Sequence, residues 1–389
     1  MNPVKNLLSK IRPCLVIVST AVCLVPHPVC AAPLVRQGAG ANPAAIQAIV
    51  DQFRTDLGGA NNGVGGTFAT GRREVNWDGV PDANAAPNFL APDFFNVTSA
   101  RGIVFNTLEI QTGGGLNDFM VSADSSNPTA TPVRFGDLDP SYTATFQAFS
   151  AQRLFIARNT NAMEAVFFVP GTKIPATVSG FGCVFTDVDT ATASTGRAAL
   201  IRAYGADGNQ LVSFTCTAAS GGLSFGGVSF TAGERVARCV IQMGNSRLAT
   251  GTTDSVTTDV VAMDDVIYGE PQPLQITNAN GVKIEAGVPL KFLSITATGA
   301  PAGFLNATLQ CSPHHVYELF QSTDLVTWAP AVVTGAPAGN TNQFNPRATW
   351  SSTTLAATLQ LSKAGQPRLF YRAVDETNNE AASIEFPGP

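Results

Sequence analysis

Apolar and polar residues alternate along most of the chain, in short runs that Gly, Pro and Asn interrupt. In one run Phe181, Cys183 and Phe185 fall at every second position, which places them on one face of an extended strand. No helical spacing recurs between these runs, so a parallel α/β sheet is not expected. The predicted strands cover residues 101–110, 118–123, 153–157, 164–169, 177–187, 198–204, 210–216, 223–230, 235–243 and 259–268. This pattern predicts an all-β fold in which residues 67–270 form a jelly-roll-like antiparallel sandwich.

One segment near the start of the chain has helical spacing instead. Its apolar positions are Ile46, Ile49, Val50, Phe53 and Leu57. Asn42 can cap the first turn, Pro43 suits the first helical position, and a glycine pair at 58–59 follows the last apolar residue. We therefore expect residues 32–66 to form a short helix with a flexible lead-in to the sandwich.

Prolines in residues 271–275 (PQPLQ) indicate a linker to a second β region, residues 276–389. The strands predicted in this region cover residues 290–298, 304–311, 316–321, 354–361 and 368–374. A region of this length with several short strands is typical of an immunoglobulin-like or fibronectin-like sandwich. The chain is therefore expected to contain two β-sandwiches in series.

Residues 1–31 have the pattern of a signal peptide. Lys5, Lys10 and Arg12 give a positive start. The apolar run that follows, residues 14–25 (CLVIVSTAVCLV), is too short to cross a bilayer as a helix. Small residues then lead to a cleavage position after Ala31. We expect an exported protein, secreted or held at the cell surface, with the periplasm as the alternative location. An uncleaved N-terminal anchor helix is the other interpretation.

Composition and charge exclude two classes of partner. Hydrophobic residues make up 44% of the chain, enough for a substantial core, and charged residues make up only 13%. The net charge of −5 becomes −8 when the three basic residues of the signal peptide are removed. An acidic chain lacks the basic stripe that electrostatic binding of nucleic acid needs. We therefore expect no nucleic-acid partner, and the short apolar runs predict no transmembrane segment.

Export makes disulfides permissible, because the compartments outside the cytosol are oxidising. The cysteines that remain after the signal peptide are Cys183, Cys216, Cys239 and Cys311. Four cysteines allow three connectivities. Cys216 and Cys239 lie on strands predicted to be neighbours, so they are the favoured pair. The alternative is that all four are small buried apolar residues.

Three stretches of the first β region are distinctive as a set: residues 71–82 (GRREVNWDGVPD), 181–189 (FGCVFTDVD) and 263–271 (MDDVIYGEP). Together they resemble a group of mostly uncharacterised exported bacterial β-sandwich proteins. The resemblance implies export and an all-β fold, and it transfers no catalytic residue. Residues 317–328 (YELFQSTDLVTW) are similar to a C-terminal immunoglobulin-like β module of bacterial exported proteins, which implies a role as a spacer or in surface association.

Two pairs of aspartates are candidate metal ligands. Asp187 and Asp189 stand two positions apart at the end of a predicted strand, so they share one face. Asp264 and Asp265 lie within the last predicted strand of the first sandwich. Calcium prefers six to eight hard oxygen ligands, and we predict that these four carboxylates hold a structural calcium ion. The alternative is that the aspartates cap turns by accepting backbone hydrogen bonds.

Trp77, Asp78 and Asp82 form the candidate ligand-binding site. A flat apolar ring beside hydrogen-bonding groups suits stacking against a sugar. The alternative is that Trp77 packs in the core or under a loop.

No catalytic signature accompanies these residues. Residues 222–226 match the G-x-S-x-G pattern, but their flanks are Gly-rich strand rather than the strand–turn–helix that a nucleophile elbow needs. The leading interpretation is a non-catalytic surface or matrix protein, not an enzyme, whose first sandwich binds an extracellular polysaccharide or another cell-surface polymer. The alternatives are a structural or adhesive protein without a small ligand, and a polysaccharide-degrading glycosidase that uses a carboxylate pair.

Overall fold

The computed structural model describes residues 32–107, 118–193, 196–206, 209–277, 283–285, 290–311, 316–331, 333–334, 349–351, 356–363, 369–375 and 380–386. The predicted signal peptide, residues 1–31, lies outside these ranges. The helical elements within them are α1 (Pro43–Asp56), η1 (Asp82–Asn84), α2 (Phe94–Val97) and α3 (Tyr142–Thr145). The longest described helix, α1, has 14 residues, and none of the described helices is long and apolar enough to cross a membrane.

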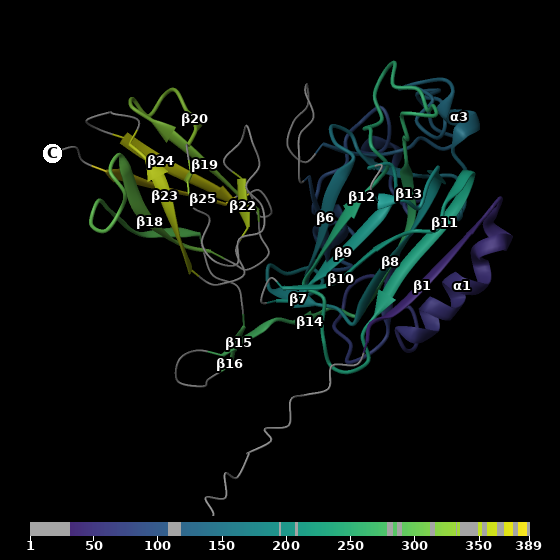
Figure 1. Cartoon of the computed structure of the whole chain (residues 1–389), viewed down its shortest axis with the longest axis horizontal. Coiled ribbons are helices and arrows are strands. Elements are labelled where there is room, and N and C mark those ends of the chain that lie inside the picture. Colours follow the sequence, from purple (N-terminus) through teal and green to yellow (C-terminus); the bar gives the residue numbers. More distant parts are fainter. Residues whose placement is uncertain are drawn as a thin grey trace, which may run out of the picture. The chain divides into compact units, whose positions relative to one another are not determined.

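Two antiparallel sheets of seven strands each form the first sandwich (Figure 1). Sheet A has the order β1 (Leu34–Gly40), β11 (Ala219–Ser229), β8 (Gly180–Val188), β13 (Ala262–Gly269), β5 (Phe155–Ala157) and β4 (Phe119–Val121), with β2 (Arg72–Val75) also paired to β13. Sheet B has the order β10 (Gln210–Thr215), β9 (Leu200–Tyr204), β12 (Arg238–Gln242), β6 (Ala162–Phe168), β7 (Pro175–Thr177) and β14 (Gln272–Pro273), with β3 (Ile103–Thr107) paired to β6.

The chain changes sheet repeatedly within this sandwich. Strand β8 lies in sheet A, β9 and β10 in sheet B, β11 in sheet A, β12 in sheet B, and β13 in sheet A again. The core between the sheets includes Phe105, Phe167, Cys183, Phe185 and Cys239. The jelly-roll-like antiparallel sandwich predicted from the alternating pattern is therefore confirmed.

Helix α1 runs beside β1 and β11 on the outer face of sheet A (Figure 1). Helix α1 confirms the predicted helix. The predicted cap is confirmed as well, since the Asn42 side chain accepts a hydrogen bond from Ala45 N at 3.2 Å. Its buried residues are Ile46, Val50 and Phe53. An added Cβ at Gly182 would lie 2.8 Å from the Phe53 ring, so this glycine lets the helix approach the sheet closely. Helix and core together bury both faces of β8.

Strand β1 has no counterpart in the sequence prediction, which gives only a short helix and a flexible lead-in to the sandwich for residues 32–66. The strand pairs with β11 along its whole length, from Leu34 opposite Ser229 to Gly40 opposite Leu223. Its sequence, LVRQGAG, contains few large apolar residues and so shows little alternation. Residues 34–40 therefore form a strand because they pair with the edge of β11, and not because of their own sequence pattern. Strand β14, which lies in the predicted linker, similarly pairs with β7.

The second β region contains two further antiparallel sheets. Sheet C has the order β17 (Lys291–Thr296), β18 (Phe304–Gln310), β23 (Ala356–Ser362) and β21 (Val333–Thr334). Sheet D has the order β20 (Ala329–Pro330), β19 (Val316–Ser322), β24 (Leu369–Asp375) and β25 (Glu380–Phe386), with β22 (Thr349–Ser351) paired to β19. A separate hairpin joins β15 (Gln275–Thr277) to β16 (Lys283–Glu285). One core spans both sheets and includes Leu305, Leu319, Leu359 and Tyr371, as expected for the predicted sandwich.

The favoured disulfide is wrong. Cys216 and Cys239 are free thiols, as are the other two cysteines of the described chain, and all four are buried. Cys216 directly follows β10 and Cys239 lies on β12, but β9 separates these strands in sheet B. Because neighbouring strands are about 4.8 Å apart, residues two strands apart exceed the Cα separation of about 7 Å that a disulfide allows. The cysteines instead serve as small buried residues.

Candidate functional site

A pocket of about 420 Å³ lies in the first sandwich beside α1, β2 and β13. Its lining residues are Gln47, Arg54, Asn61, Glu74, Asn76, Arg101, Phe149, Ser150 and Asp265. All of them except Phe149 carry side-chain hydrogen-bonding groups, so we call this hollow the polar pocket. Its volume falls within the range of small-molecule binding sites.

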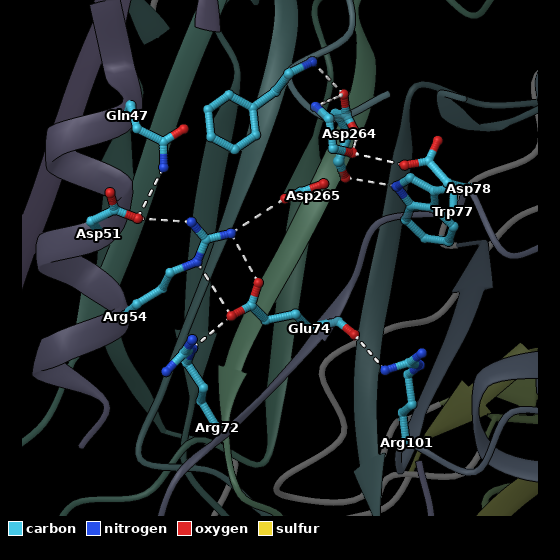
Figure 2. Close-up of polar contacts among 12 residues, drawn as sticks. Gln47, Asp51, Arg54, Arg72, Glu74, Trp77, Asp78, Arg101, Asp264 and Asp265 are labelled. Carbon is cyan, nitrogen blue, oxygen red and sulfur yellow. Dashed lines mark hydrogen bonds and ion pairs between the residues drawn. The ribbon is translucent and has the colours of Figure 1, made fainter. Parts of the chain in front are cut away.

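Helix α1 supplies one wall through its polar face. Gln47, Asp51 and Arg54 are spaced four and three residues apart, which aligns them along the helix. Asp51 accepts hydrogen bonds of 2.9 Å from both Gln47 and Arg54. These contacts hold the Arg54 guanidinium over the neighbouring sheet (Figure 2).

Glu74 on β2 is the centre of a network of arginines. Arg54 donates to the two Glu74 carboxylate oxygens at 3.2 and 2.9 Å, and Arg72 Nε donates to Oε1 at 2.6 Å. Arg101 Nη1 donates to the main-chain carbonyl of Glu74 at 3.1 Å (Figure 2). Bidentate contacts between a guanidinium and a carboxylate have a fixed geometry, so this ion pair holds the Glu74 and Arg54 side chains in place at the pocket.

Asp264 and Asp265 lie in a β-bulge of β13. The pairing of β13 with β8 shifts register between Met263 and Val266, which brackets both aspartates. Adjacent side chains of a regular strand point to opposite faces, and a bulge changes these directions. The bulge therefore allows the two carboxylates to lie near each other beside the polar pocket (Figure 2).

The two aspartates have different partners. The Asp264 carboxylate accepts hydrogen bonds from the backbone N–H of Phe149 at 2.5 Å and from the Ser150 hydroxyl at 3.2 Å. The Asp265 carboxylate instead lies 3.6 Å from Arg54 Nη2. Asp264 thus fixes the turn that carries Phe149, whereas Asp265 lines the pocket.

Electrostatics distinguish Asp265 from an ordinary surface acid. Burial is the main cause that raises its pKa to about 6, and the neighbouring Arg54 acts in the opposite direction. Burial also raises the pKa of Asp264 well above its usual range, and the adjacent Asp265 charge adds to this effect. The pocket therefore contains an acid that can hold a proton under mildly acidic conditions.

A second hollow, of about 230 Å³, adjoins the polar pocket because Asn76 and Arg101 line both. Its walls also include Trp77, Phe94 and Phe95, so we call it the aromatic hollow. A ligand in the polar pocket that extended past Asn76 would meet apolar surface there.

Trp77 is a core residue and not the exposed platform predicted from the sequence. Its side chain is only 1% exposed. The ring stacks on Phe155, with centroids 4.0 Å apart and planes 4° apart. Its Nε1 donates to the main-chain carbonyl of Asp264 at 2.7 Å. The alternative interpretation of Trp77, packing in the core, therefore holds.

Asp78 and Asp82 are brought together around Arg153 rather than around an exposed ring. Asp78 accepts hydrogen bonds from Arg153 N at 3.2 Å and from the Ser150 hydroxyl at 3.3 Å. Asp82 accepts one from Arg153 Nη2 at 2.6 Å. Both carboxylates thus hold the segment that forms part of the pocket wall, and direct contact with a ligand stays a prediction.

The four predicted metal-ligating aspartates do not form one site. Asp187 and Asp189 converge with a third residue, Asp254. In the part of the chain that the structure describes, Asp264 and Asp265 do not belong to this convergent group: Asp264 binds the turn at Phe149, and Asp265 lines the polar pocket. The prediction that all four aspartates share one metal site is therefore wrong.

Arg54, Glu74 and Arg101 were not identifiable as site residues from the sequence. The polar face of α1 and the alternation in β2 give a weak signal for Arg54 and Glu74, since both patterns leave them off the apolar side. Their meeting depends on the pairing of β2 with β13 and on the packing of α1 over the sheet. Arg101 lies on a loop and carries no such signal.

A buried ion pair holds the loop that follows Asn61. Arg73 Nη2 lies 2.7 Å from Glu270 Oε1, and both side chains are almost completely buried. The same guanidinium donates to the carbonyls of Gly63, Gly65 and Gly66. It therefore orders the glycine-rich loop that follows Asn61 at the pocket wall.

The polar pocket combines amides, a hydroxyl, guanidinium groups and carboxylates around one half-buried phenyl ring. The Asn76 side chain is exposed and has no hydrogen-bond partner among the described residues, so it is available to a ligand. No protein-family model matches this chain, and no curated protein matches its sequence. The chemistry of the lining residues suits a ligand with many hydroxyl groups and little net charge.

Proposed function

We propose that this is an exported, non-catalytic protein that binds carbohydrate, and that the polar pocket of its first sandwich holds the sugar. The observation that carries the proposal is the set of fixed donors and acceptors in a pocket of about 420 Å³ next to an aromatic-lined hollow. Sugar hydroxyls both donate and accept hydrogen bonds, and the C–H faces of a sugar ring pack on aromatic side chains.

Charge balance favours a neutral ligand over a charged one. Arg54 is already paired with Glu74 and faces Asp265, and Arg72 also bonds to Glu74. A charged ligand that bound at Arg54 or Glu74 would have to break these ion pairs, whereas hydroxyl groups can share their oxygens and N–H groups without separating the charges. We therefore favour a neutral polysaccharide segment.

The two adjoining hollows support a chain ligand. Asn76 and Arg101 stand at the boundary, so one sugar unit in the polar pocket would continue past them into the aromatic hollow. The next unit would then lie against the walls of the aromatic hollow, which include Phe94 and Phe95. Such an arrangement suits internal segments of an extracellular polymer, in agreement with an exported protein.

A glycosidase is the second candidate, and one contact favours it. Glu74 Oε2 and Asp265 Oδ2 lie 2.9 and 3.6 Å from the same Arg54 nitrogen, so two carboxylates flank one point of the pocket. Hydrolysis needs one acid that donates a proton and another that attacks or activates water. Binding is preferred because the Arg54 guanidinium occupies the space between the two carboxylates and Glu74 accepts hydrogen bonds from two arginines.

The test is retention of the mature chain, residues 32–389, on a panel of insoluble and soluble polysaccharides, with an assay for new reducing ends. The informative variant is Asn76→Ala, because this exposed side chain has no internal partner to lose. We expect it to weaken retention about tenfold, the effect of losing one or two hydrogen bonds to a ligand. The matched control is Asn88→Ala, an exposed asparagine outside both hollows, which should leave retention unchanged.

Two outcomes would contradict the proposal. New reducing ends from the wild-type chain, abolished in Asp265→Asn, would establish the glycosidase instead. No retention on any polymer of the panel would favour the structural or adhesive alternative.

A further inference from the structure

A group of acidic side chains lies at another place in the first sandwich, where β8 ends. Asp187 is on β8 and Asp189 directly follows it, whereas Asp254 comes from the loop that leads to β13. Ligand atoms of these three residues all lie within 4.8 Å of one another. Such convergence of carboxylates is unfavourable unless a cation or shared protons balance the charge.

A fourth aspartate points toward the same place and is incompletely satisfied. Asp259 is fully buried, and its Oδ2 accepts a hydrogen bond of 3.4 Å from the backbone N–H of Asp189. Its Oδ1 is buried with no hydrogen-bond partner in the described residues. We call Asp187, Asp189, Asp254 and Asp259 the acidic cluster.

Asp187 presents a second unsatisfied oxygen. Its side chain is 2% exposed, and its Oδ1 accepts a hydrogen bond of 2.7 Å from Gly221 N. Its Oδ2 is buried without a hydrogen-bond partner in the described chain. Buried carboxylate oxygens nearly always have a partner, so two orphaned oxygens beside converging acids indicate a missing ligand with positive charge.

The protein's own charges balance the cluster only in part. Within the described residues one ion pair reaches it, from Arg197 to Asp189. Arg197 also donates to the carbonyls of Ser255 and Val256, which holds the loop over the cluster. Burial, followed by the neighbouring carboxylates, raises the pKa of Asp259 to about 8. Burial raises the pKa of Asp187 to about 7, to which the charges of Asp254 and Asp189 contribute.

We propose that the acidic cluster binds one calcium ion, which joins the end of β8 to the loop preceding β13. Calcium accepts six to eight oxygen ligands in flexible geometry, and carboxylates can each supply one or two of them. Magnesium requires a stricter octahedral arrangement and retains its water, so it suits this irregular set of loop ligands less well. The proposal is independent of the polar pocket and of carbohydrate binding.

The experiment is calorimetric titration of the chelator-treated mature chain with calcium chloride alone, up to about 5 mM, because extracellular calcium modules bind at about 10⁻⁴–10⁻³ M. Thermal unfolding is measured in parallel with calcium and with chelator. We expect one site per chain and a higher Tm in calcium. Absence of a binding isotherm in this range, or equal affinity for magnesium, would overturn the assignment.

The decisive variant is Asp259→Asn, which removes one buried charge while nearly preserving the shape of the side chain. In chelator we expect its Tm to equal or exceed that of the wild type, since charge repulsion decreases. Its calcium affinity should fall at least about tenfold. A folded variant that binds calcium like the wild type would overturn the proposal.

The matched control is Asp93→Asn. The Asp93 carboxylate is half-exposed, has no hydrogen-bond partner in the described residues and is not part of the acidic cluster. This control should retain the wild-type calcium affinity and Tm increase. Equal loss of binding in Asp93→Asn and Asp259→Asn would reveal a general effect of charge and would also overturn the site.

Discussion

Replacement of Trp77 by phenylalanine tests whether this residue belongs to the core or binds a ligand. The indole ring stacks on Phe155, contacts Phe95 edge-on with centroids 5.3 Å apart, and donates its N–H to the carbonyl of Asp264. Trp77 also has a positive φ of 64°, a conformation that is unfavourable for a bulky residue. Phenylalanine would keep this backbone cost, so the comparison isolates the ring and its hydrogen bond.

The expected loss follows from two contributions. Without the indole N–H, the buried Asp264 carbonyl loses this partner, which costs about 1–3 kcal/mol. The smaller ring leaves unfilled space and removes apolar contact worth about 1 kcal/mol. We therefore expect Trp77→Phe to lower the free energy of unfolding by about 2–4 kcal/mol, a large part of the stability of an ordinary domain.

The assay is urea unfolding of residues 32–389 followed by circular dichroism, with separate transitions fitted for the two sandwiches. The control is Trp328→Phe, because the Trp328 ring is half-buried and its Nε1 donates to Leu325 at 3.2 Å in an exposed turn. This control should cost less than about 1 kcal/mol. A loss below about 1 kcal/mol for Trp77→Phe, together with strongly reduced retention on polysaccharide, would refute the assignment of Trp77 to the core.

Three further predictions concern stability and redox state. Arg73→Met leaves Glu270 buried without its ion pair and should lower the free energy of unfolding in urea by about 3–5 kcal/mol. The double variant with Glu270→Gln should recover part of this stability, and a decrease below about 1 kcal/mol for Arg73→Met would contradict the prediction. In chelator, the acidic cluster should make stability fall as pH rises from about 4 to 8, because the raised pKa values of Asp187 and Asp259 mean that the folded state binds more protons there. After allowance for solvent screening, we expect the free energy of unfolding to fall by roughly 1–3 kcal/mol over this pH range, relative to the Asp259→Asn variant. A stability difference between wild type and variant that does not change with pH would refute the reasoning. Thiol titration of residues 32–389 should find all four cysteines of this range unreactive when folded and reactive in denaturant. A smaller number in denaturant would indicate a disulfide.

Local pattern in the sequence determined the secondary structure of most of the first sandwich. The predicted runs 164–169, 177–187 and 259–268 each overlap a strand, because short apolar runs bounded by turn residues are typical of strands that are buried on both faces. The N-cap, the proline and the apolar spacing of α1 likewise act within a few residues of one another. Strand β1 escaped prediction because its pairing partner lies almost two hundred residues away.

The candidate sites depended on the tertiary structure. Composition could not distinguish Trp77 in the core from Trp77 on the surface, because the same ring serves both roles. Cys216 and Cys239 were expected on neighbouring strands, but the order of sheet B placed β9 between them.

The sequence also did not show which aspartates lie together. Asp264 and Asp265 were expected to join Asp187 and Asp189, but Asp264 binds the turn at Phe149 and Asp265 lines the polar pocket. Asp254 joins the other pair instead. The sequence by itself thus determined most of the strands, the helix and the all-β class, because these follow from periodicity over a few residues. Only the tertiary structure decided which side chains meet, because strand order, bulges and helix packing are fixed by contacts between distant parts of the chain.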